Sequence, residues 1–527
     1  VAIKRMEGVF SFARRKEVSV VLWVFVFAFL TLLGYQSYWQ LFISNDDFAE
    51  TKMLHDPRPW IIEATTLKGK IYDRHHDDSK ILAGYTQPTN GGLPRRYYPL
   101  GEATSHLIGY SDVERGKDGL EKFYFERLMG WTSSTEAEKQ NKINNKYFRV
   151  KPIGNDIVLT IDYELQKTAY EAFGSNKGAV VAIEPATGDI LVLVSAPSFH
   201  PDSVSVDDAW VRIVKDEENQ RLYNRALKGR YPPGSTFKPI VAAAALESGI
   251  DPVWNLGPGG YRPPGVRRKR VHDHERASYA KRGRVWRGQG KTDMTKALVK
   301  SSNHYFAKLG VTVGDSMMHE MAYRFGYNQP VAWNISRPEL YDKIVAFRSS
   351  FPPTANAHEL AWSCIGQEKV LATPLQLALT AAAIANKGIL MKPKLELDEP
   401  PEVWHRVMSE ATADKVKKMM REVVWARGGT AWRMRMKEVE VGGKTGTAEL
   451  TKIIEHEDGT KEAVIVNNAV FISLGPIDNP KMAIAVIAEE AGYGGAAAAP
   501  IAKQVYLKAY ELGYFNKTGD QIATNKD

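Results

Sequence analysis

A single long apolar run lies near the start of the chain. Residues 18–34 contain no charged side chain, and the aromatic residues Tyr35, Tyr38 and Trp39 follow them. The run is at the short end of the length that a helix needs to cross a bilayer, and such aromatic residues extend a helix into the interface. No second run of comparable length exists. The pattern therefore predicts one transmembrane helix over residues 18–38 and a single-pass protein.

Charges flank this run unevenly. Basic residues precede it, at Lys4, Arg5, Arg14, Arg15 and Lys16, and acidic residues follow it, at Asp46, Asp47 and Glu50. By the positive-inside rule, residues 1–17 stay in the cytoplasm and everything after the helix lies on the periplasmic or extracellular side of the cell (inner) membrane. The alternative is a cleaved signal peptide, but no Ala-x-Ala site follows and the run is long for one.

Beyond the helix the pattern divides into two regions and a tail. Residues 39–150 are polar and charged, with short strand candidates at 81–83 and 97–101. Residues 151–515 alternate between apolar strand patterns and helical patterns. Residues 516–527 are expected to form a polar tail. We therefore expect two domains after the membrane segment, and the larger one contains the candidate chemistry.

Strand and helix patterns are segregated within residues 151–515. Strands are expected at 156–161, 178–183, 189–194, 444–447, 463–466, 469–474 and 482–488. Helices are expected directly after Asp162 and at 238–248, 293–300, 374–386 and 410–427. The segment Glu-Pro-Ala-Thr-Gly at 184–188 separates two apolar runs, which is a hairpin signature. Strands at both ends with helices between them predict an α+β fold, in which helices flank an antiparallel sheet.

Composition narrows the class of protein. The chain has 527 residues, of which 25% are charged and 44% hydrophobic, so it can form two sizeable globular cores. Its net charge of +9 favours anionic partners. Nucleic acid is the weaker choice, because neither a glycine-rich phosphate loop nor zinc-type Cys/His spacing occurs. Cys364 is the only cysteine, which excludes an intrachain disulfide, and its apolar setting predicts a buried, inert thiol.

Three short motifs stand in order along the second region. They are Ser-Thr-Phe-Lys at 235–238, Ser-Ser-Asn at 301–303 and Lys-Thr-Gly-Thr at 444–447. Each is weak alone: residues 278–281 also read Ser-x-x-Lys, and residues 517–519 repeat Lys-Thr-Gly. Order, spacing and local setting must therefore decide between them.

The setting of Ser235 favours it as a nucleophile. Two prolines and a glycine precede it and Pro239 follows Lys238, so a helix is expected to begin at about Ser235. Ser235 and Lys238 then lie on one helix face, and a desolvated lysine near another cation can take the proton from a serine. Ser278 and Lys281, by contrast, stand among arginines and predict a solvated basic loop.

The second and third motifs supply the remaining polar groups. At the end of a helical pattern, the Ser301 hydroxyl can relay a proton and the Asn303 amide can hold a substrate amide, although a lone triplet of this kind is usually a helix cap. Lys444, on a strand bordering a cleft, would favour the neutral form of Lys238.

Further groups of the third motif can bind a ligand. Thr445 and Thr447 can hydrogen-bond a substrate carboxylate, and Gly446 lets a ligand approach the backbone. The backbone N–H groups of Ser235 and Thr447 form a candidate oxyanion hole.

Two other segments carry notable residues. His-Asp-His-Glu at 272–275 contains candidate metal ligands, but the arginines and lysine at 267–270 would repel a cation. A solvated loop is favoured there; alternatively, the segment borders the cleft and meets anionic glycan or lipid-phosphate groups. The glycine-rich stretch 491–495 is expected to be a mobile loop at the cleft's edge, without a catalytic role.

The ordered motifs resemble the active-site signature of penicillin-recognising serine transferases and hydrolases. The wider chain resembles the class B penicillin-binding proteins, whose pedestal and catalytic-domain motifs are matched at 68–74, 119–121, 159–166, 184–188, 365–367 and 373–378. Three departures stand out: Lys68 replaces an arginine, residues 75–78 replace a tight turn, and Glu368 stands where glycine is usual.

This resemblance implies a D,D-transpeptidase domain on a β-rich extended pedestal. In such an enzyme Ser235 attacks the penultimate D-alanine of a peptidoglycan stem peptide, terminal D-alanine leaves, and an amine of a neighbouring stem peptide resolves the acyl-enzyme. The resemblance implies that Lys238 is the base, Ser301 the proton relay and Asn303 an orienting group. It assigns recognition of the substrate carboxylate to Lys444, Thr445 and Thr447. β-Lactams would acylate Ser235, and neither a metal nor an organic cofactor is required.

The resemblance also suggests partners and leaves rivals open. A multi-span, SEDS-type glycan polymerase is expected to contact the transmembrane helix and the pedestal. The elongation type is favoured over the division type, because the chain has no C-terminal repeat modules and its pedestal is compact. The rival functions are a β-lactamase, a β-lactam sensor and a scaffold that only positions partners.

Overall fold

The computed structural model describes residues 16–38, 61, 63–86, 92–131, 153–267, 269–335, 346–455 and 460–515. Predictions for the cytoplasmic N-terminus, for the acidic residues after the apolar run, and for the tail with its second Lys-Thr-Gly lie outside these residues. The chain separates into two units, residues 1–65 and 66–527. Each unit is described by itself.

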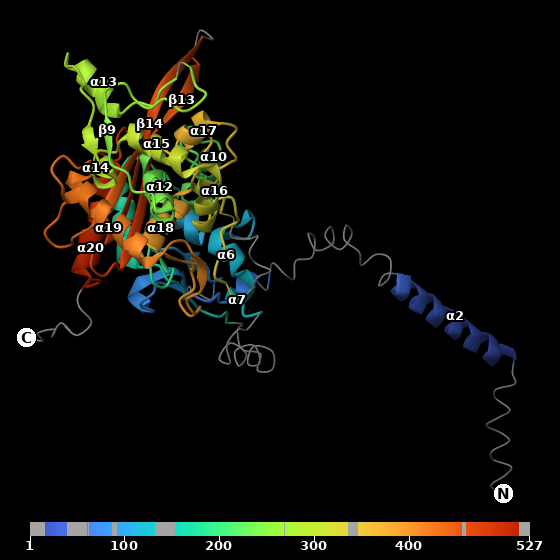
Figure 1. The fold of residues 1–527 in the computed structure, drawn as a ribbon. Helices are drawn as coiled ribbons and strands as arrows, with labels where there is room; N and C mark the ends of the chain where they lie inside the picture. Colours follow the sequence, from blue (N-terminus) through green and yellow to red (C-terminus); the bar gives the residue numbers. More distant parts are fainter. Residues whose placement is uncertain are drawn as a thin grey trace, which may run out of the picture. The chain divides into compact units, whose positions relative to one another are not determined.

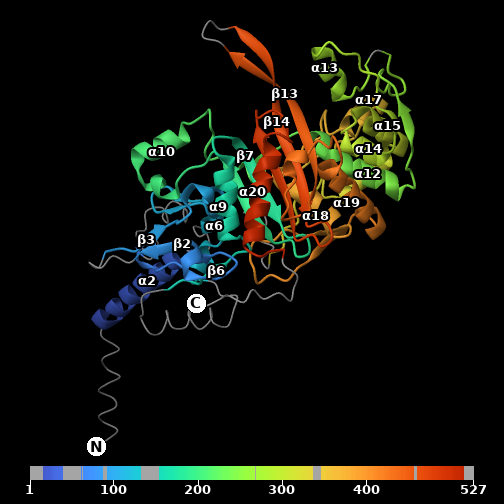
Figure 2. The ribbon, with the colours of Figure 1, turned by 90° about the vertical axis from the view of Figure 1, so that its left-hand side faces the viewer.

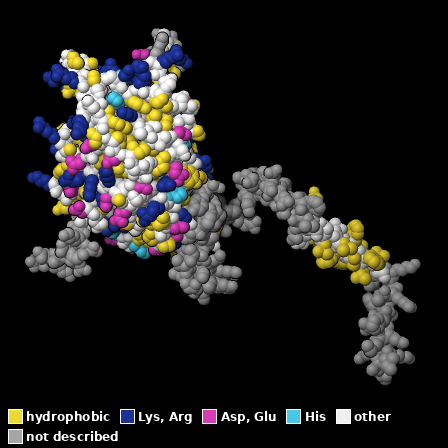
Figure 3. Space-filling view, in the orientation of Figure 1, with side chains coloured by type: hydrophobic (Ala, Val, Ile, Leu, Met, Phe, Trp, Pro, Cys, Tyr) yellow, Lys and Arg dark blue, Asp and Glu magenta, His cyan; other side chains and the backbone are white. Residues whose placement is uncertain are grey.

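The described part of the first unit is dominated by helix α2 (Lys16–Tyr38) (Figure 1). Its side chains from Val20 to Tyr38 are all exposed, and Figure 3 shows them as mostly hydrophobic. The stretch Ser19–Tyr38 has a mean hydropathy of 1.9, and it is long and apolar enough to cross a membrane. The predicted helix is therefore confirmed as a candidate membrane span.

The second unit is built around a five-stranded antiparallel sheet in the order β13-β14-β15-β7-β8. The strands are β7 (Lys177–Ile183), β8 (Ile190–Ala196), β13 (Gly442–Glu455), β14 (Lys461–Gly475) and β15 (Met482–Glu489). Strands β7 and β8 form the predicted hairpin. The prediction of two separate strands at 463–466 and 469–474 was wrong: Asn467 and Asn468, which look like a break, pair with β13 inside one continuous strand.

Helices cover both faces of this sheet (Figure 2). Helix α18 (Pro374–Ala385) is buried along its whole length and packs on β7, β14 and β15, as a helix that is apolar all round must. Helices α9 (Tyr163–Phe173) and α20 (Ala498–Glu511) pack together on the other face. Asp162 caps α9 as predicted, because its side chain accepts a hydrogen bond from the Leu165 N–H. The α+β fold expected from the sequence is confirmed.

A second group of helices includes the two that begin at Lys238 and Asn303. The group consists of α12 (Lys238–Glu247), α13 (His274–Lys281), α14 (Met294–Val299), α15 (Asn303–Val313), α16 (Asp315–Arg324), α17 (Ala357–Ser363) and α19 (Glu410–Trp425). The predicted helices at 238–248, 293–300 and 410–427 match α12, α14 and α19 to within two residues at each end.

The pedestal is made of short elements. Its four-stranded sheet has the order β3-β2-β1-β6, with β1 (Ile71–Tyr72), β2 (Ile81–Thr86), β3 (Arg95–Tyr97) and β6 (Ile157–Val158). It also contains the one-turn helices α5 (Ser105–Ile108), α6 (Gly119–Phe123) and α7 (Phe125–Leu128). The strand expected at 156–161 shortens to β6, which pairs in parallel with β1, so it belongs to this sheet. Where the pedestal ends stays a prediction.

The turn after β1 forms without glycine. The Asp73 carboxylate accepts from the His75 N–H, and the Asp73 carbonyl accepts from the His76 N–H. His76 adopts a left-handed φ of 52°. The chain therefore closes a turn over residues 73–76 although residues 75–78 depart from the family's usual turn sequence.

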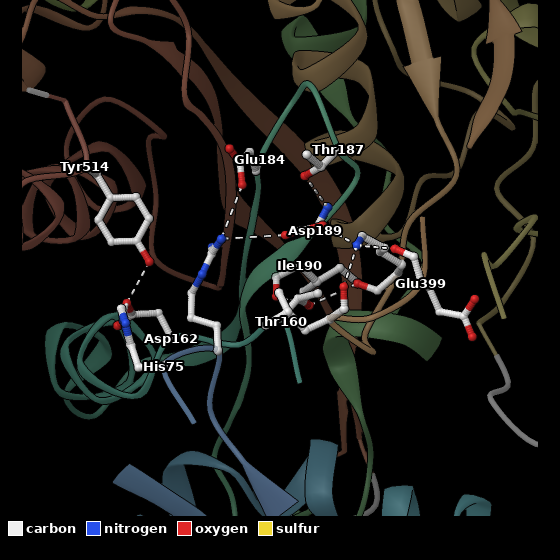
Figure 4. A network of polar contacts seen from close by, with 12 residues as sticks. His75, Thr160, Asp162, Glu184, Thr187, Asp189, Ile190, Glu399 and Tyr514 are labelled. Carbon is white, nitrogen blue, oxygen red and sulfur yellow. Dashed lines mark hydrogen bonds and ion pairs between the residues drawn. The ribbon is translucent and has the colours of Figure 1, made fainter. Parts of the chain in front are cut away.

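A network of charges joins this turn to the sheet and to the C-terminal segment (Figure 4). The Arg74 guanidinium lies 3.4 Å from Glu184 and 3.6 Å from Asp189. Asp162 Oδ2 lies 3.0 Å from His75 Nε2 and accepts from the Tyr514 hydroxyl at 2.6 Å. These ion pairs and hydrogen bonds therefore join the turn after β1, the β7–β8 hairpin and the C-terminal segment, which are far apart in sequence.

Replacing Arg74 by alanine is expected to destabilise the protein by about 2 kcal/mol, because it leaves the half-buried Glu184 carboxylate without its cation, while Asp189 keeps Lys394 at 3.2 Å. Thermal or denaturant unfolding of the purified protein measures the change. Arg324→Ala is the matched control: its pair with Glu320 is exposed on one helix, and such pairs contribute less than about 0.5 kcal/mol. Equal losses in the two variants would contradict a special role for the buried network.

Candidate active site

Ser235 lies at the start of a helix, close to where the sequence predicted. It stands in the 3₁₀ helix η6 (Gly234–Phe237), which continues directly into α12 at Lys238. Ser235 is the only residue between 231 and 240 that is not buried. Pro239 occupies the first turn of α12, where its missing N–H costs nothing. The local sequence therefore presents one hydroxyl on an otherwise buried segment.

Close backbone contacts fix the position of η6. Gly234 has a φ of +54°, and a Cβ there would lie 2.5 Å from Thr447 O and 3.2 Å from Thr447 N. Gly366 has a φ of +74°, and its Cβ would overlap the backbone of Gly234. The Gly234 N–H donates to Gly366 O at 2.8 Å. The backbones of residues 234, 366 and 447 thus meet at distances that only glycine allows.

Lys238 is fully buried, with its ammonium held by three oxygen atoms. Nζ donates to Ser301 O and Asn303 Oδ1, both at 2.7 Å, and to Ser301 Oγ at 3.3 Å. Burial lowers the pKa of Lys238 to about 7, although the carboxylates of Asp273 and Glu275 act in the opposite direction. A lysine with this pKa is partly neutral at physiological pH and can accept a proton.

Lys444 is also fully buried and shares a partner with Lys238. Its Nζ donates to Ser301 Oγ at 2.9 Å and to Thr445 O at 2.7 Å. Burial, and then the charge of Lys238, lower the pKa of Lys444 well below its usual value. The sequence argument named the charge of Lys444 as the cause of a neutral Lys238. The structure gives burial as the cause that lowers the pKa of Lys238, whereas the repulsion between the two lysines lowers the pKa of Lys444.

The second motif sits between two helices. Helix α14 ends at Val299, and Ser301 adopts a left-handed φ of 55°, a conformation that is strained for a residue with a side chain. Ser302 then caps α15 by accepting from the Tyr305 N–H. The helix-cap interpretation thus applies to Ser302, while Ser301 and Asn303 are turned toward the lysines.

The third motif runs along β13. Because side chains alternate along a strand, Thr445 and Thr447 share one face, and both line the cleft. Thr445 Oγ1 donates to Thr430 Oγ1 at 2.8 Å. A Cβ at Gly446 would lie 2.8 Å from Pro233 O, so this glycine allows β13 to lie against η6.

These residues surround one cleft of about 810 Å³. Of the residues predicted from the sequence, Ser235, Ser301, Asn303, Thr445, Gly446 and Thr447 line it. The two lysines lie behind its wall. Tyr493, Gly494 and Gly495 also line it, which agrees with the prediction that the stretch 491–495 lies at the cleft's edge. Sequence reasoning missed further lining residues, among them Trp362, Thr430, Trp432, Arg433 and Glu449. They come from helix α17, from the 3₁₀ helix η8 (Trp432–Met434), from the loop before it and from β13, at positions without a motif.

The segment after residue 271 corrects one prediction. Residues 274–281 form helix α13, not a solvated loop, and Asp273 is only 6% exposed. Ser278 accepts a hydrogen bond from Arg282 and is not among the residues that line the cleft. His272, Asp273 and Glu275 do line it, which agrees with the alternative that this segment borders the cleft. Figure 3 shows Lys and Arg side chains gathered over the α13 end of the molecule.

Two smaller predictions can also be checked. Cys364 is fully buried, and burial raises the pKa of its thiol, so the prediction of an inert residue is supported. Glu368 has a left-handed φ of 59°, which explains why glycine is the usual residue at this place. Within the described part of the chain, no group of three or more His, Cys, Asp or Glu side chains could hold a metal ion.

Comparison with known proteins agrees with this geometry. The sequence profile of the penicillin binding protein transpeptidase domain matches residues 178–507. The chain belongs to this family. Its described motifs and its sheet are therefore those of a penicillin-binding protein transpeptidase.

Relatives in several bacteria narrow the subfamily. The chain is 32% identical to the peptidoglycan D,D-transpeptidase MrdA of Acinetobacter baumannii, over 78% of this chain and 65% of that protein. It is 33% identical to the peptidoglycan D,D-transpeptidase PbpA of Mycolicibacterium smegmatis, over 82% of this chain and 88% of that protein. The resemblance to class B penicillin-binding proteins is confirmed.

Solved structures show the same fold. Penicillin-binding protein A of M. tuberculosis, as a ceftriaxone acyl-enzyme complex, superposes with a TM-score of 0.71 at 28% identity, covering 85% of this chain and 99% of that one. Pseudomonas aeruginosa PBP2 in complex with WCK 5153 gives a TM-score of 0.67 at 29% identity, covering 88% and 100%.

The burial of Lys238 makes its effect on stability depend on pH. Its pKa is about 7 in the folded protein and 10.5 in the unfolded chain, so the unfolded chain binds more protons between these values. Lys238 therefore destabilises the fold most at or below pH 7, and this penalty disappears as the pH rises to 10.5. Relative to wild type, Lys238→Met is expected to be more stable at pH 6 than at pH 10, by on the order of 3 kcal/mol.

Denaturant unfolding at the two pH values measures this difference. Lys418→Met, on the exposed side of α19, is the matched control and is expected to show no such dependence. A pH-independent difference for Lys238→Met would mean that the amine is not desolvated in the folded protein.

Proposed function

We propose that this protein is a peptidoglycan D,D-transpeptidase that crosslinks stem peptides through an acyl intermediate on Ser235. The observation that carries the proposal is a single accessible serine, three residues before a buried lysine whose pKa is about 7. The names of the MrdA and PbpA relatives support the same reaction.

In the first step Ser235 Oγ attacks the carbonyl carbon of the penultimate D-alanine. Its proton passes to the neutral amine of Lys238. Negative charge develops on the carbonyl oxygen, and the N–H groups of Ser235 and Thr447 are the proposed donors to it. The close contact of Gly234 with the Thr447 backbone supports this pairing, because it holds the two segments side by side.

The intermediate collapses by expelling terminal D-alanine, whose amine needs a proton. Ser301 Oγ accepts hydrogen bonds from both Lys238 and Lys444, so it can pass a proton from the amine side to the leaving group. In the second step an amine of another stem peptide attacks the acyl carbon. The same relay, running in reverse, removes the proton of that amine.

Substrate orientation is assigned to the cleft face. We propose that Thr445 and Thr447 hydrogen-bond the terminal carboxylate, with Lys444 supplying positive charge from behind the strand. Asn303 Oδ1 is engaged by Lys238, so its role is to hold the lysine as well as to face the peptide amide. β-Lactams would acylate Ser235 as mimics of the terminal dipeptide.

We assign the protein to wall elongation and to the cell membrane. Similarity to the MrdA and PbpA proteins supports the elongation type over the division type. Helix α2 would anchor the chain with residues 1–17 in the cytoplasm and the catalytic domain outside. A multi-span, SEDS-type glycan polymerase remains the proposed partner of the helix and the pedestal.

Labelling with a fluorescent penicillin tests the nucleophile. Ser235→Ala is expected to abolish the labelled band, whereas Ser278→Ala, which changes the other Ser-x-x-Lys sequence, leaves labelling at the wild-type level. Labelling that survives Ser235→Ala would overturn the assignment. Wild-type turnover of free β-lactam would indicate a β-lactamase, and normal crosslinking in cells carrying only Ser235→Ala would indicate a scaffold.

A further inference from the structure

Asp273 stands where a helix cap is expected but does not cap its own helix. It is the residue before α13, yet its carboxylate accepts no hydrogen bond from that helix. Asp at this position usually accepts from the second or third N–H of the helix that follows. Because the side chain is nearly fully buried, its hydrogen bonds must lie elsewhere.

The carboxylate binds the start of a different helix, the one that carries Asn303. Asp273 Oδ1 accepts from the Ser302 hydroxyl and from the His304 N–H, both at 2.9 Å. Ser302 caps α15 with the same hydroxyl group, and His304 is the second residue of that helix. The two residues on either side of Asn303 are therefore held by one carboxylate.

The neighbouring carbonyl orients Asn303 itself. Asn303 Nδ2 donates to His272 O at 3.2 Å, which leaves Oδ1 to accept from Lys238 Nζ. With the amide turned the other way, two donors would face each other at Lys238. Residues 272 and 273 thus form an unbroken chain of hydrogen bonds that ends on the proposed catalytic base.

We propose that Asp273 is a positioning residue for the transfer reaction, which holds Ser301, Asn303 and, through them, Lys238 in the reactive geometry. The inference rests on the proposed roles of Ser235 and Lys238. It gives a use to the His-Asp-His-Glu segment that does not involve a metal.

The near-isosteric substitution Asp273→Asn separates the hydrogen bonds of this residue from its charge. Asp273 Oδ2 accepts from Gln289 Nε2 at 3.1 Å, while Gln289 Oε1 is buried without a hydrogen-bond partner. In Asp273→Asn, rotation of the Gln289 amide therefore presents an acceptor to the new NH₂ group. The remaining oxygen still accepts from Ser302 and His304, so this variant keeps the hydrogen bonds and loses only the charge.

The rate of acylation by a fluorescent penicillin, measured against pH, separates geometry from charge. Asp273→Ala is expected to acylate about 100-fold more slowly, because small displacements of catalytic groups have effects of this size. Asp273→Asn is expected to stay within about threefold of wild type at high pH, since its hydrogen bonds persist.

The acidic limb of the Asp273→Asn profile is expected to move to lower pH. The charged groups that face Lys238 are Lys444 from β13 and the carboxylates of Asp273 and Glu275. Removing one of these carboxylates favours the neutral amine. A residue that served only the stability of the fold would not shift this limb.

Asp293→Ala is the matched control. It also removes an aspartate that caps a helix next to the second motif, α14, but that side chain is exposed and touches none of residues 301–304 in the described hydrogen bonds. Its acylation is expected to match wild type. If Asp273→Ala does not fold, Ser302→Ala removes one arm of the same contact, and roughly tenfold slower acylation is expected.

Two results would overturn the inference. One is wild-type acylation in folded Asp273→Ala or in Ser302→Ala. The other is an equal loss in Asp273→Asn and Asp273→Ala, because charge alone would then explain the effect. Either result leaves the label on Ser235 intact, whereas failure of the proposed function would appear as labelling that survives Ser235→Ala.

Discussion

The site depends on two lysine side chains that lie side by side without any exposed surface. Removing an ammonium group from water is costly, and a second one nearby adds repulsion. The fold offsets this cost with oxygen atoms of Ser301, Asn303 and Thr445, all of which belong to the second and third motifs. What the protein gains is an amine that can lose its proton near neutral pH. Stability is given up here for reactivity, as is common at active sites.

Glycine makes the compact arrangement possible. Residues 234, 366 and 446 bring the serine turn, the loop after α17 and strand β13 to backbone contact. With larger residues these segments would separate, and the lysines behind them would be reached by water. The glycines therefore act on the chemistry indirectly, by keeping the wall of the cleft closed over the amines.

Local signals in the sequence were sufficient for much of this structure. Proline and glycine around Ser235 gave the start of α12, and the apolar runs around residues 184–188 gave the hairpin. The signal failed where a side chain's partner is distant in sequence. Asn467 and Asn468 look like a break between two strands, but they pair with β13 within one long strand. The charged residues near 272 predicted a solvated loop, whereas the structure has a helix there, preceded by a buried aspartate. The conditions that set the pKa of Lys238 are its complete burial and the nearby carboxylates of Asp273 and Glu275, and both depend on tertiary packing that no local sequence pattern reveals.

The network of polar contacts that includes Arg74, Asp162 and Tyr514 has a consequence for how the protein unfolds. The largest hydrophobic core contains Ile71 and Leu82 of the pedestal together with Val181 and Ile487 of the catalytic sheet. Pedestal and catalytic region therefore share one interior and one set of buried ions. A fragment that begins after the pedestal would keep the three active-site motifs, yet it would expose apolar surface that the pedestal covers and leave Glu184 without the Arg74 guanidinium. Such a fragment is therefore a poor substitute for a chain that includes the pedestal, since the two regions share one hydrophobic core.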